Sequence, residues 1–300
     1  MLSQKRARRA GITYGALAAA SYGTNPLFSL PMISAGIGVN SVLFYRYAFA
    51  ILIYWVWLKF FKKLSLKVSK SEMFSFLFLG LNFSLSSLTL FSAFKYIDSG
   101  IACTILFIYP VIVAIIMSLF FKEKLTISVI LAIVFTFCGI WLLNNSSENL
   151  NILGVVLVLI SALMYAIYIV AIKTMKSIKR VKHDVLAFYV MLSGLFVYIL
   201  NLKFCTTLQI FDRPFFWLCA IGLAVFPTII SLETINVSIK LIGSTKTAIL
   251  GALEPITAVV LGVLIFHEKL TVRSTLGILL ILVGVIIVIF AKKEKKFEKD

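Results

Sequence analysis

Charged residues are scarce in this chain of 300 residues. They make up 14% of it, and only 12 are acidic, whereas hydrophobic residues make up 61%. Ordinary globular domains contain about 25% charged and about 45–50% apolar residues, so this chain has too few polar side chains to cover a soluble fold. A larger core cannot hide the excess, because a single hydrophobic core stops growing near this length. The composition therefore predicts an integral membrane protein.

Histidine, aspartate and cysteine are also few, and their scarcity excludes several kinds of chemistry. The 2 histidines and 4 cysteines have no HExxH, CxxC or other metal-ligand spacing, and the aspartates fall near helix ends or in loops. An intramembrane enzyme would need such a constellation, so it is the least favoured alternative. No Walker motif is present, which excludes ATP hydrolysis by this chain. We expect no metal and no cofactor.

The net charge of +17 would suggest a nucleic-acid partner in a soluble protein. Here the basic residues form short clusters between apolar runs, the pattern that orients helices in a membrane. We therefore expect the lipid bilayer, and not nucleic acid, to be the partner.

Ten apolar stretches are long enough to span a bilayer, which needs about 20 residues of helix. They cover residues 12–33, 41–61, 72–94, 98–120, 126–143, 152–173, 184–203, 215–238, 243–265 and 271–291. Of the 29 Lys and Arg residues, 23 fall in the N-terminus, segments 59–70, 122–124, 173–182 and 240–246, and the tail 292–299. Only 5 fall in the joints on the other side. This asymmetry predicts that both termini are cytoplasmic, in the inner membrane of a cell.

The two halves of the chain resemble each other. A shift of 145 residues aligns residues 95–141 with 240–286 without gaps, including Pro110 with Pro255 and one Glu-Lys-Leu-Thr block at 123–126 with another at 268–271. We interpret these blocks as structural turns in which Thr126 and Thr271 cap the following helices. Because each half has an odd number of spans, the second half enters the membrane from the opposite side and is inverted relative to the first. The sequence thus predicts an all-α membrane protein of ten helices, in two inverted five-helix repeats (1–147 and 148–300) around a central cavity.

The chain resembles the EamA-type family of the drug/metabolite transporter superfamily. The resemblance rests on Ser21-Tyr22-Gly23-Thr24-Asn25, Arg46 with the small residues after it, Tyr109-Pro110, Glu254-Pro255 and the two Glu-Lys-Leu-Thr blocks. It implies ten helices around a cavity and, usually, export of small metabolites such as amino acids. The family often has tryptophan where this chain has Tyr22, and Glu233 in the eighth stretch has no known family role.

Glu254 is the first candidate for the transport site, because an ionisable side chain at mid-membrane is costly and normally faces protein or water. Pro255 cannot donate a backbone hydrogen bond, so we expect a helix kink that frees the Gly251 carbonyl. Tyr109 and Pro110 hold the equivalent place in the first half. Both pairs could equally serve helix packing.

Arg46 is the natural partner for a substrate carboxylate, although snorkelling to the membrane interface is the alternative. The remaining candidates are polar or aromatic side chains within the apolar stretches, which either contact substrate or bind neighbouring helices. They are Tyr22 and Asn25 in the first stretch, Asn82 and Ser86 in the third, and Tyr165, with Tyr168 one turn on, in the sixth.

The function predicted from these features is secondary transport of small metabolites such as amino acids or their derivatives, as an exporter using alternating access. Proton coupling through Glu254 is a further prediction. The alternative within the superfamily is an antiporter for phosphorylated metabolites or nucleotide sugars. It is less favoured because the mid-membrane segments offer only Arg46, and Lys246 near one end, as fixed positive charge.

Overall fold

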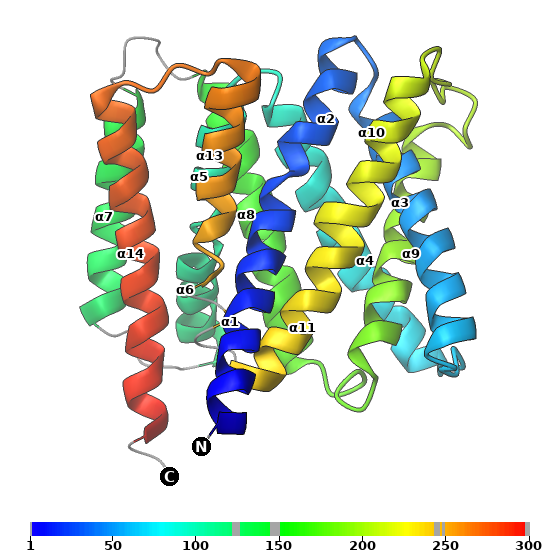
Figure 1. Ribbon diagram of the computed structural model, residues 1–300, viewed down its shortest axis with the longest axis horizontal. Helices are drawn as coiled ribbons and strands as arrows, with labels where there is room; N and C mark the ends of the chain where they lie inside the picture. Colours follow the sequence, from blue (N-terminus) through cyan, green and yellow to red (C-terminus); the bar gives the residue numbers. More distant parts are fainter. Residues whose placement is uncertain (1, 122–126, 145–150, 243–246, 248–249, 298–300) are drawn as a thin grey trace.

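The computed structural model describes residues 2–121, 127–144, 151–242, 247 and 250–297. These residues form a bundle of helices, and no strand occurs among them (Figure 1). The start of α1 and the end of α14 lie at the same end of the bundle, the bottom of Figure 1. We call this the terminal end and the other the opposite end.

The helices are α1 (Leu2–Gly23), α2 (Asn25–Ser34), α3 (Val39–Val56), the π-helical turn η1 (Trp57–Phe61), α4 (Lys70–Ala93), α5 (Ser99–Leu106), α6 (Tyr109–Phe121), α7 (Ile127–Asn144), α8 (Ile152–Thr174), α9 (His183–Asn201), α10 (Pro214–Ala224), the π-helical turn η2 (Val225–Ile230), α11 (Ser231–Ile242), α13 (Leu253–Phe266) and α14 (Val272–Phe297).

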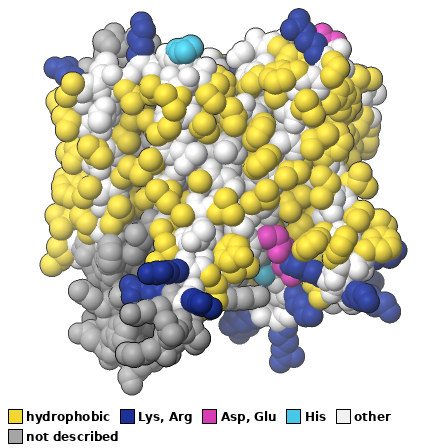
Figure 2. Space-filling model, viewed as in Figure 1, with side chains coloured by type: hydrophobic (Ala, Val, Ile, Leu, Met, Phe, Trp, Pro, Cys, Tyr) yellow, Lys and Arg dark blue, Asp and Glu magenta, His cyan; other side chains and the backbone are white. Residues whose placement is uncertain are grey.

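Six helical segments among the described residues are long and apolar enough to cross a membrane. They are Val39–Phe61, Lys70–Ala93, Ser99–Phe121, Ile152–Thr174, His183–Asn201 and Pro214–Ile239. In the most apolar window of each, between 33% and 56% of the residues are buried. The rest form a hydrophobic outer surface, and lysine and arginine side chains gather at its two ends (Figure 2). The chain is therefore an all-helical membrane protein.

Among the other predicted stretches, 271–291 corresponds to the continuous helix α14, whereas the first is interrupted. The first, 12–33, is broken at Thr24, whose backbone N–H turns back to the carbonyl of Ser21. Pro26 then stands in the first turn of α2, where its missing N–H costs no helical hydrogen bond. Parts of the stretches 126–143 and 243–265 lie outside the described residues, as does the predicted boundary between the halves at 147.

The two halves pack reciprocally. Equivalent helices lie against each other in three pairs, α3 with α9, α5 with α13 and α7 with α14. The remaining contacts are exchanged: α4 of the first half packs on α8 of the second, and α1 packs on α11, the equivalent of part of α4. Such reciprocity is expected of two repeats related by a pseudo-two-fold axis, and it makes each half a wall of one shared interior.

One predicted joint can be checked directly. α13 ends at Phe266, the next residue, His267, turns the chain sharply with a φ of 57°, and α14 begins at Val272. The Thr271 hydroxyl accepts a hydrogen bond from the backbone N–H of Ser274 at 3.1 Å, so the predicted cap is confirmed. The equivalent Thr126 lies outside the described residues.

Candidate functional site

A cavity of about 270 Å³ lies between the two halves. Its lining comes from helices of both: Gly15, Ala18, Ala19, Tyr22, Arg46, Phe83, Tyr109, Tyr165, Tyr168, Ala187, Val190, Met191, Pro227, Thr228, Ser231, Leu232, Ile235, Ile239, Thr247, Gly251 and Glu254. Most of these side chains are apolar, and a few polar groups are set among them, as is usual in sites for small molecules.

The cavity occupies the half of the bundle nearer the termini. It extends along α1 from Tyr22 back to Gly15 and along α11 from Ser231 to Ile239, whose side chain is exposed. No lining residue comes from α2, α5 or α10, the helices that lead to the opposite end. In this conformation the cavity therefore faces the terminal end and is closed towards the other.

Arg46 lies at the inner boundary of the cavity. It is 2% exposed, its Nε donates to the Thr228 hydroxyl at 3.0 Å, and its guanidinium lies 5.5 Å from the centre of the Phe91 ring. Snorkelling to the interface is therefore not its role. Within the described part of the chain, no carboxylate pairs with Arg46 and no hydrogen bond occupies its two terminal nitrogens. A planar donor fork is thus left available to a bound carboxylate.

Glu254 lines the cavity from the first turn of α13. Its own backbone N–H donates to the Gly251 carbonyl at 3.0 Å, so this carbonyl is not left without a partner as the sequence suggested. The Glu254 carboxylate has no hydrogen bond or ion pair with any described residue. Close packing places it: a Cβ on Gly23 would come within 2.6 Å of the Glu254 backbone oxygen, so the glycine lets α1 approach this turn.

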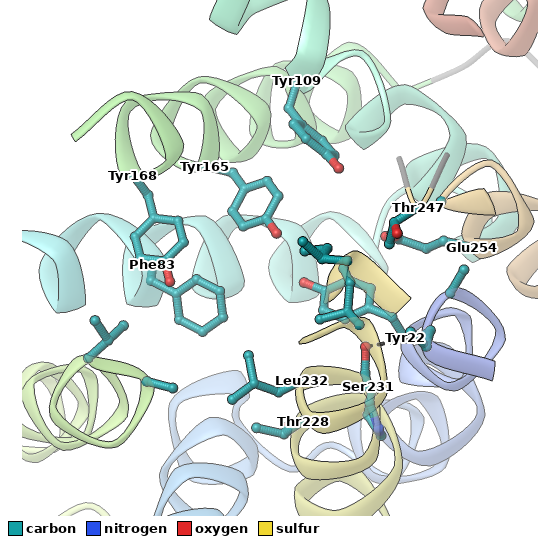
Figure 3. A pocket seen from close by; sticks show the side chains of 18 of the residues that line it. Tyr22, Phe83, Tyr109, Tyr165, Tyr168, Thr228, Ser231, Leu232, Thr247 and Glu254 are labelled. Carbon is teal, nitrogen blue, oxygen red and sulfur yellow. Dashed lines mark hydrogen bonds between the residues drawn. The ribbon is translucent and has the colours of Figure 1, made fainter. Parts of the chain in front are cut away.

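The aromatic side chains form one connected wall. The rings of Tyr109 and Tyr165 are 4.7 Å apart and perpendicular, those of Tyr165 and Tyr168 are 5.8 Å apart and stacked, and Phe83 lies 5.2 Å from Tyr168. Figure 3 shows Phe83 and Tyr168 on one side of the cavity and Glu254 with Thr247 on the other. The site is thus divided into an aromatic side and a polar side.

Tyr22 lines the same cavity as Arg46 and Glu254, a basic and an acidic side chain. Opposite charges therefore act on a common region of the cavity, which is the electrostatic pattern that a zwitterion complements.

Five of the eight predicted substrate residues line the cavity: Tyr22, Arg46, Tyr109, Tyr165 and Glu254. The other three do not. Asn25 donates to the Tyr22 carbonyl at 2.8 Å, Asn82 donates to the Phe78 carbonyl at 2.8 Å, and Ser86 pairs with Ser161 at 3.0 Å. The hydroxyls of Ser86 and Ser161 hold α4 to α8, so this pair serves helix packing. Pro110 and Pro255 stand in the first turns of α6 and α13, as the expected kinks require.

Sequence reasoning missed Phe83, Thr228 and Ser231. Thr228, Ser231, Leu232 and Ile235 follow one another at helical spacing and line the cavity together. The sequence did not indicate this face of the helix, because the ionisable residue nearby, Glu233, lies on a different face. Phe83 carries no polar signal at all. Among the described residues, no group of histidine, cysteine and acidic side chains could hold a metal ion.

Comparison with known proteins agrees with this arrangement. The profile of the EamA-like transporter family matches residues 9–145 and, a second time, residues 152–290. The chain belongs to the EamA-like transporter family. The double match is the two-repeat architecture of the fold, and membership of this family places the chain among transporters and not among enzymes.

Individual relatives extend the comparison. An uncharacterized transporter from Archaeoglobus fulgidus is 28% identical over 198 residues, which cover 65% of this chain and 69% of that protein. A second uncharacterized transporter from the same organism is 34% identical over 73 residues, 24% of this chain and 26% of that protein. A protein of known crystal structure shares the fold with a TM-score of 0.65, at 17% identity, over 94% of this chain and 97% of its own.

Proposed function

We propose that this EamA-family member is a secondary transporter that exports small amphipathic metabolites, amino acids or their derivatives, by alternating access between its two repeats. The observation that carries the proposal is the combination of charges in one cavity. Arg46 offers a fork of unoccupied donors, Glu254 offers a carboxylate without a partner among the described residues, and Tyr22 lines the same cavity. An α-carboxylate on Arg46 and an ammonium group near Glu254 would satisfy both.

The aromatic wall supports an amphipathic substrate. A ligand that holds its charged groups against Arg46 and Glu254 would direct its remaining atoms towards Tyr165, Tyr168 and Phe83 (Figure 3). These rings bury apolar surface, and the hydroxyls of the two tyrosines can select among polar substituents of the substrate.

Orientation and topology belong to the same proposal. We infer ten membrane spans in an inner membrane, with both termini in the cytoplasm, because the clusters of lysine and arginine favour that side. The cavity then faces the cytoplasm in this conformation, which is the loading state of an exporter. Glu254, as the ionisable group without a fixed partner, is the residue through which a proton gradient would drive release.

The test is uptake of labelled amino acids into liposomes that hold the purified protein, with and without a pH gradient. We expect Glu254→Gln to lose gradient-driven uptake while keeping exchange, and Arg46→Gln to lose both. Glu72→Gln, a change at a surface carboxylate far from the cavity, serves as the control and should retain both. If the wild type moves no amino acid under any gradient, the amino-acid proposal fails. Screening would then turn to phosphorylated metabolites and nucleotide sugars.

A further inference from the structure

Three helices separate the cavity from the opposite end of the bundle. α5 runs from the opposite end towards the cavity, and every one of its eight residues is buried. α13 begins at the cavity with Glu254 and runs back to the opposite end beside α5. α2 begins next to Glu254 and packs against α13. A substrate leaving the cavity towards the opposite end must pass this group of helices.

One carboxylate joins α5 of the first half to the end of α13 in the second half. Glu268, which follows α13, accepts hydrogen bonds from the backbone N–H of Ser99 at 2.8 Å, from the Ser99 hydroxyl at 2.6 Å and from the N–H of Gly100 at 3.2 Å. It therefore occupies the N-terminus of α5, where a negative charge also meets the helix dipole favourably. Hydrogen bonds in which one partner is charged are stronger than those between neutral groups.

Two glycines make the space for this carboxylate. A Cβ on Gly262 of α13 would lie 2.1 Å from the Glu268 Oε2 atom, and one on Gly100 of α5 would lie 2.9 Å from the Val259 backbone. Larger residues at either position would push the carboxylate away from α5 or separate α5 from α13. The contact is thus built into the packing of both halves and is more than a turn at the surface.

Two buried oxygens in the same region have no partner. The Asn25 Oδ1 and Ser29 Oγ atoms, four residues apart on one face of α2, make no hydrogen bond in this conformation. Their side chains are 2% and 0% exposed. Buried polar atoms are nearly always satisfied, so an unsatisfied pair requires an explanation. A state in which this face meets water or substrate would satisfy both.

On the basis of the proposed transport function, we propose that α2, α5 and α13 form the gate of the cavity towards the opposite end. Glu268 is its latch, which holds α5 while the gate is closed. Asn25 and Ser29 line the passage once the gate opens, and there they contact the polar groups of the substrate as it leaves. Asn25 is then a substrate contact of the second conformation and not of the one described here.

The first experiment measures access to Ser29 from the opposite end. Cys103, Cys138, Cys205 and Cys219 are replaced by alanine, Ser29→Cys is introduced, and a membrane-impermeant thiol reagent is added on the side of the opposite end. We expect slow labelling of Ser29→Cys alone. Adding Glu268→Ala should speed it about tenfold or more, and adding Ser99→Ala should speed it less, because only one donor is lost.

The matched control is Glu72→Gln. Glu72 also accepts from the N–H of a serine at a helix start, Ser69, but it does so within one half and at the surface. It should leave the labelling rate unchanged. The melting temperature of each variant shows whether it is folded. If folded Glu268→Ala and Ser99→Ala variants also leave the labelling rate unchanged, Glu268 is not a latch.

The second experiment separates the passage from the cavity. We expect Asn25→Ala and Ser29→Ala to slow turnover severalfold while the equilibrium affinity for substrate stays within about twofold, because neither residue lines the cavity. If turnover and affinity fell equally, or if neither of them changed, Asn25 and Ser29 would not line the exit passage. The labelling experiment needs no substrate, so a wrong substrate assignment would leave its outcome interpretable and would not be mistaken for a wrong gate.

Discussion

At each end of the cavity, different interactions hold the helices together. At the terminal end, the Lys62 ammonium contacts Glu233 at 2.8 Å and Asp184 at 3.2 Å, and all three side chains are about a quarter exposed. At the opposite end, Glu268 is also partly buried, but it accepts hydrogen bonds from the N–H groups of Ser99 and Gly100 at the start of α5. Partly exposed ion pairs between long side chains are screened by water and salt, whereas backbone donors at a helix start are held in place by the helix itself.

This difference shows which side of the transporter is easy to open. The terminal end joins α9 to α11 mainly through side chains, with Lys62 between Asp184 and Glu233 and with Asn236 against His183 at 3.1 Å. Such contacts can exchange for water at little cost. The opposite end is closed by helix packing and by one carboxylate that accepts three hydrogen bonds, so opening it requires a larger compensating interaction. Bound substrate is the natural source of that interaction.

The largest expected effect is at the opposite end. Gly262→Ala places a methyl group where the Glu268 carboxylate lies, so the three hydrogen bonds to α5 are lost or weakened. We expect the free energy of unfolding to fall by about 2 kcal/mol or more, measured by thermal or denaturant unfolding in detergent. Gly284→Ala, where the nearest atom would be 3.1 Å away, is the control and should cost less. Equal costs would mean that Glu268 adds nothing to the closure.

The next effect lies at the boundary between the two ends, at Arg46. Loss of a charge-assisted contact in Arg46→Gln should weaken substrate binding about tenfold or more, measured by calorimetry or a radioligand assay. Arg46→Lys keeps the charge but not the planar fork, so its affinity for substrate should lie between that of the wild type and that of Arg46→Gln. If lysine restores full affinity, the guanidinium does not bind a carboxylate through paired hydrogen bonds.

A smaller effect is expected at the terminal end. Lys62→Gln should lower the free energy of unfolding by about 1 kcal/mol or less, and high salt should reduce the difference. Burial lowers the pKa of Lys62, but its bonds to Glu233 and Asp184 outweigh burial and raise the pKa above the ordinary 10.5. The contribution should therefore be constant at neutral pH and disappear only as the pH rises through this raised value. A loss of stability on acidification through neutral pH would point to another group.

The smallest effect concerns Ser86, which packs between helices and lies outside both ends. Ser86→Ala removes its hydrogen bond to Ser161 but no group of the cavity, so affinity and transport should change less than about twofold. A clear loss of affinity would show that α4 turns this face to the cavity during the cycle.

Much of the fold could be predicted because the bilayer leaves few alternatives. Long apolar runs must be helices there, and the shift of 145 residues is explained by two repeats that share one interior. Breaks within spans were less visible. The sequence predicts kinks at Pro110 and Pro255, but the break at Thr24, shortly before Pro26 in the first turn of α2, was not predicted.

The sequence predicted those site residues whose side chains are rarely found in a membrane, and it missed those whose side chains are common there. Arg46 and Glu254 stand out as ionisable groups in apolar runs, and both line the cavity. Asn82 and Ser86 were equally visible, yet they bond to their own or a neighbouring helix, because polar residues in a bilayer have two uses that look the same in sequence. The role we propose for Glu268 could not be read at all, since it depends on which helix start lies beside a turn.

Three half-helices begin around the cavity, each with a proline in its first three residues: α2 at Asn25, α6 at Tyr109 and α13 at Leu253. No side chain caps the starts of α2 and α13. A helix start carries roughly half a positive charge, so these starts give the centre of the bundle a positive potential without any further ionised side chain. A substrate anion would be attracted by these partial charges as well as by Arg46, and the partial charges need no counter-ion when the anion departs.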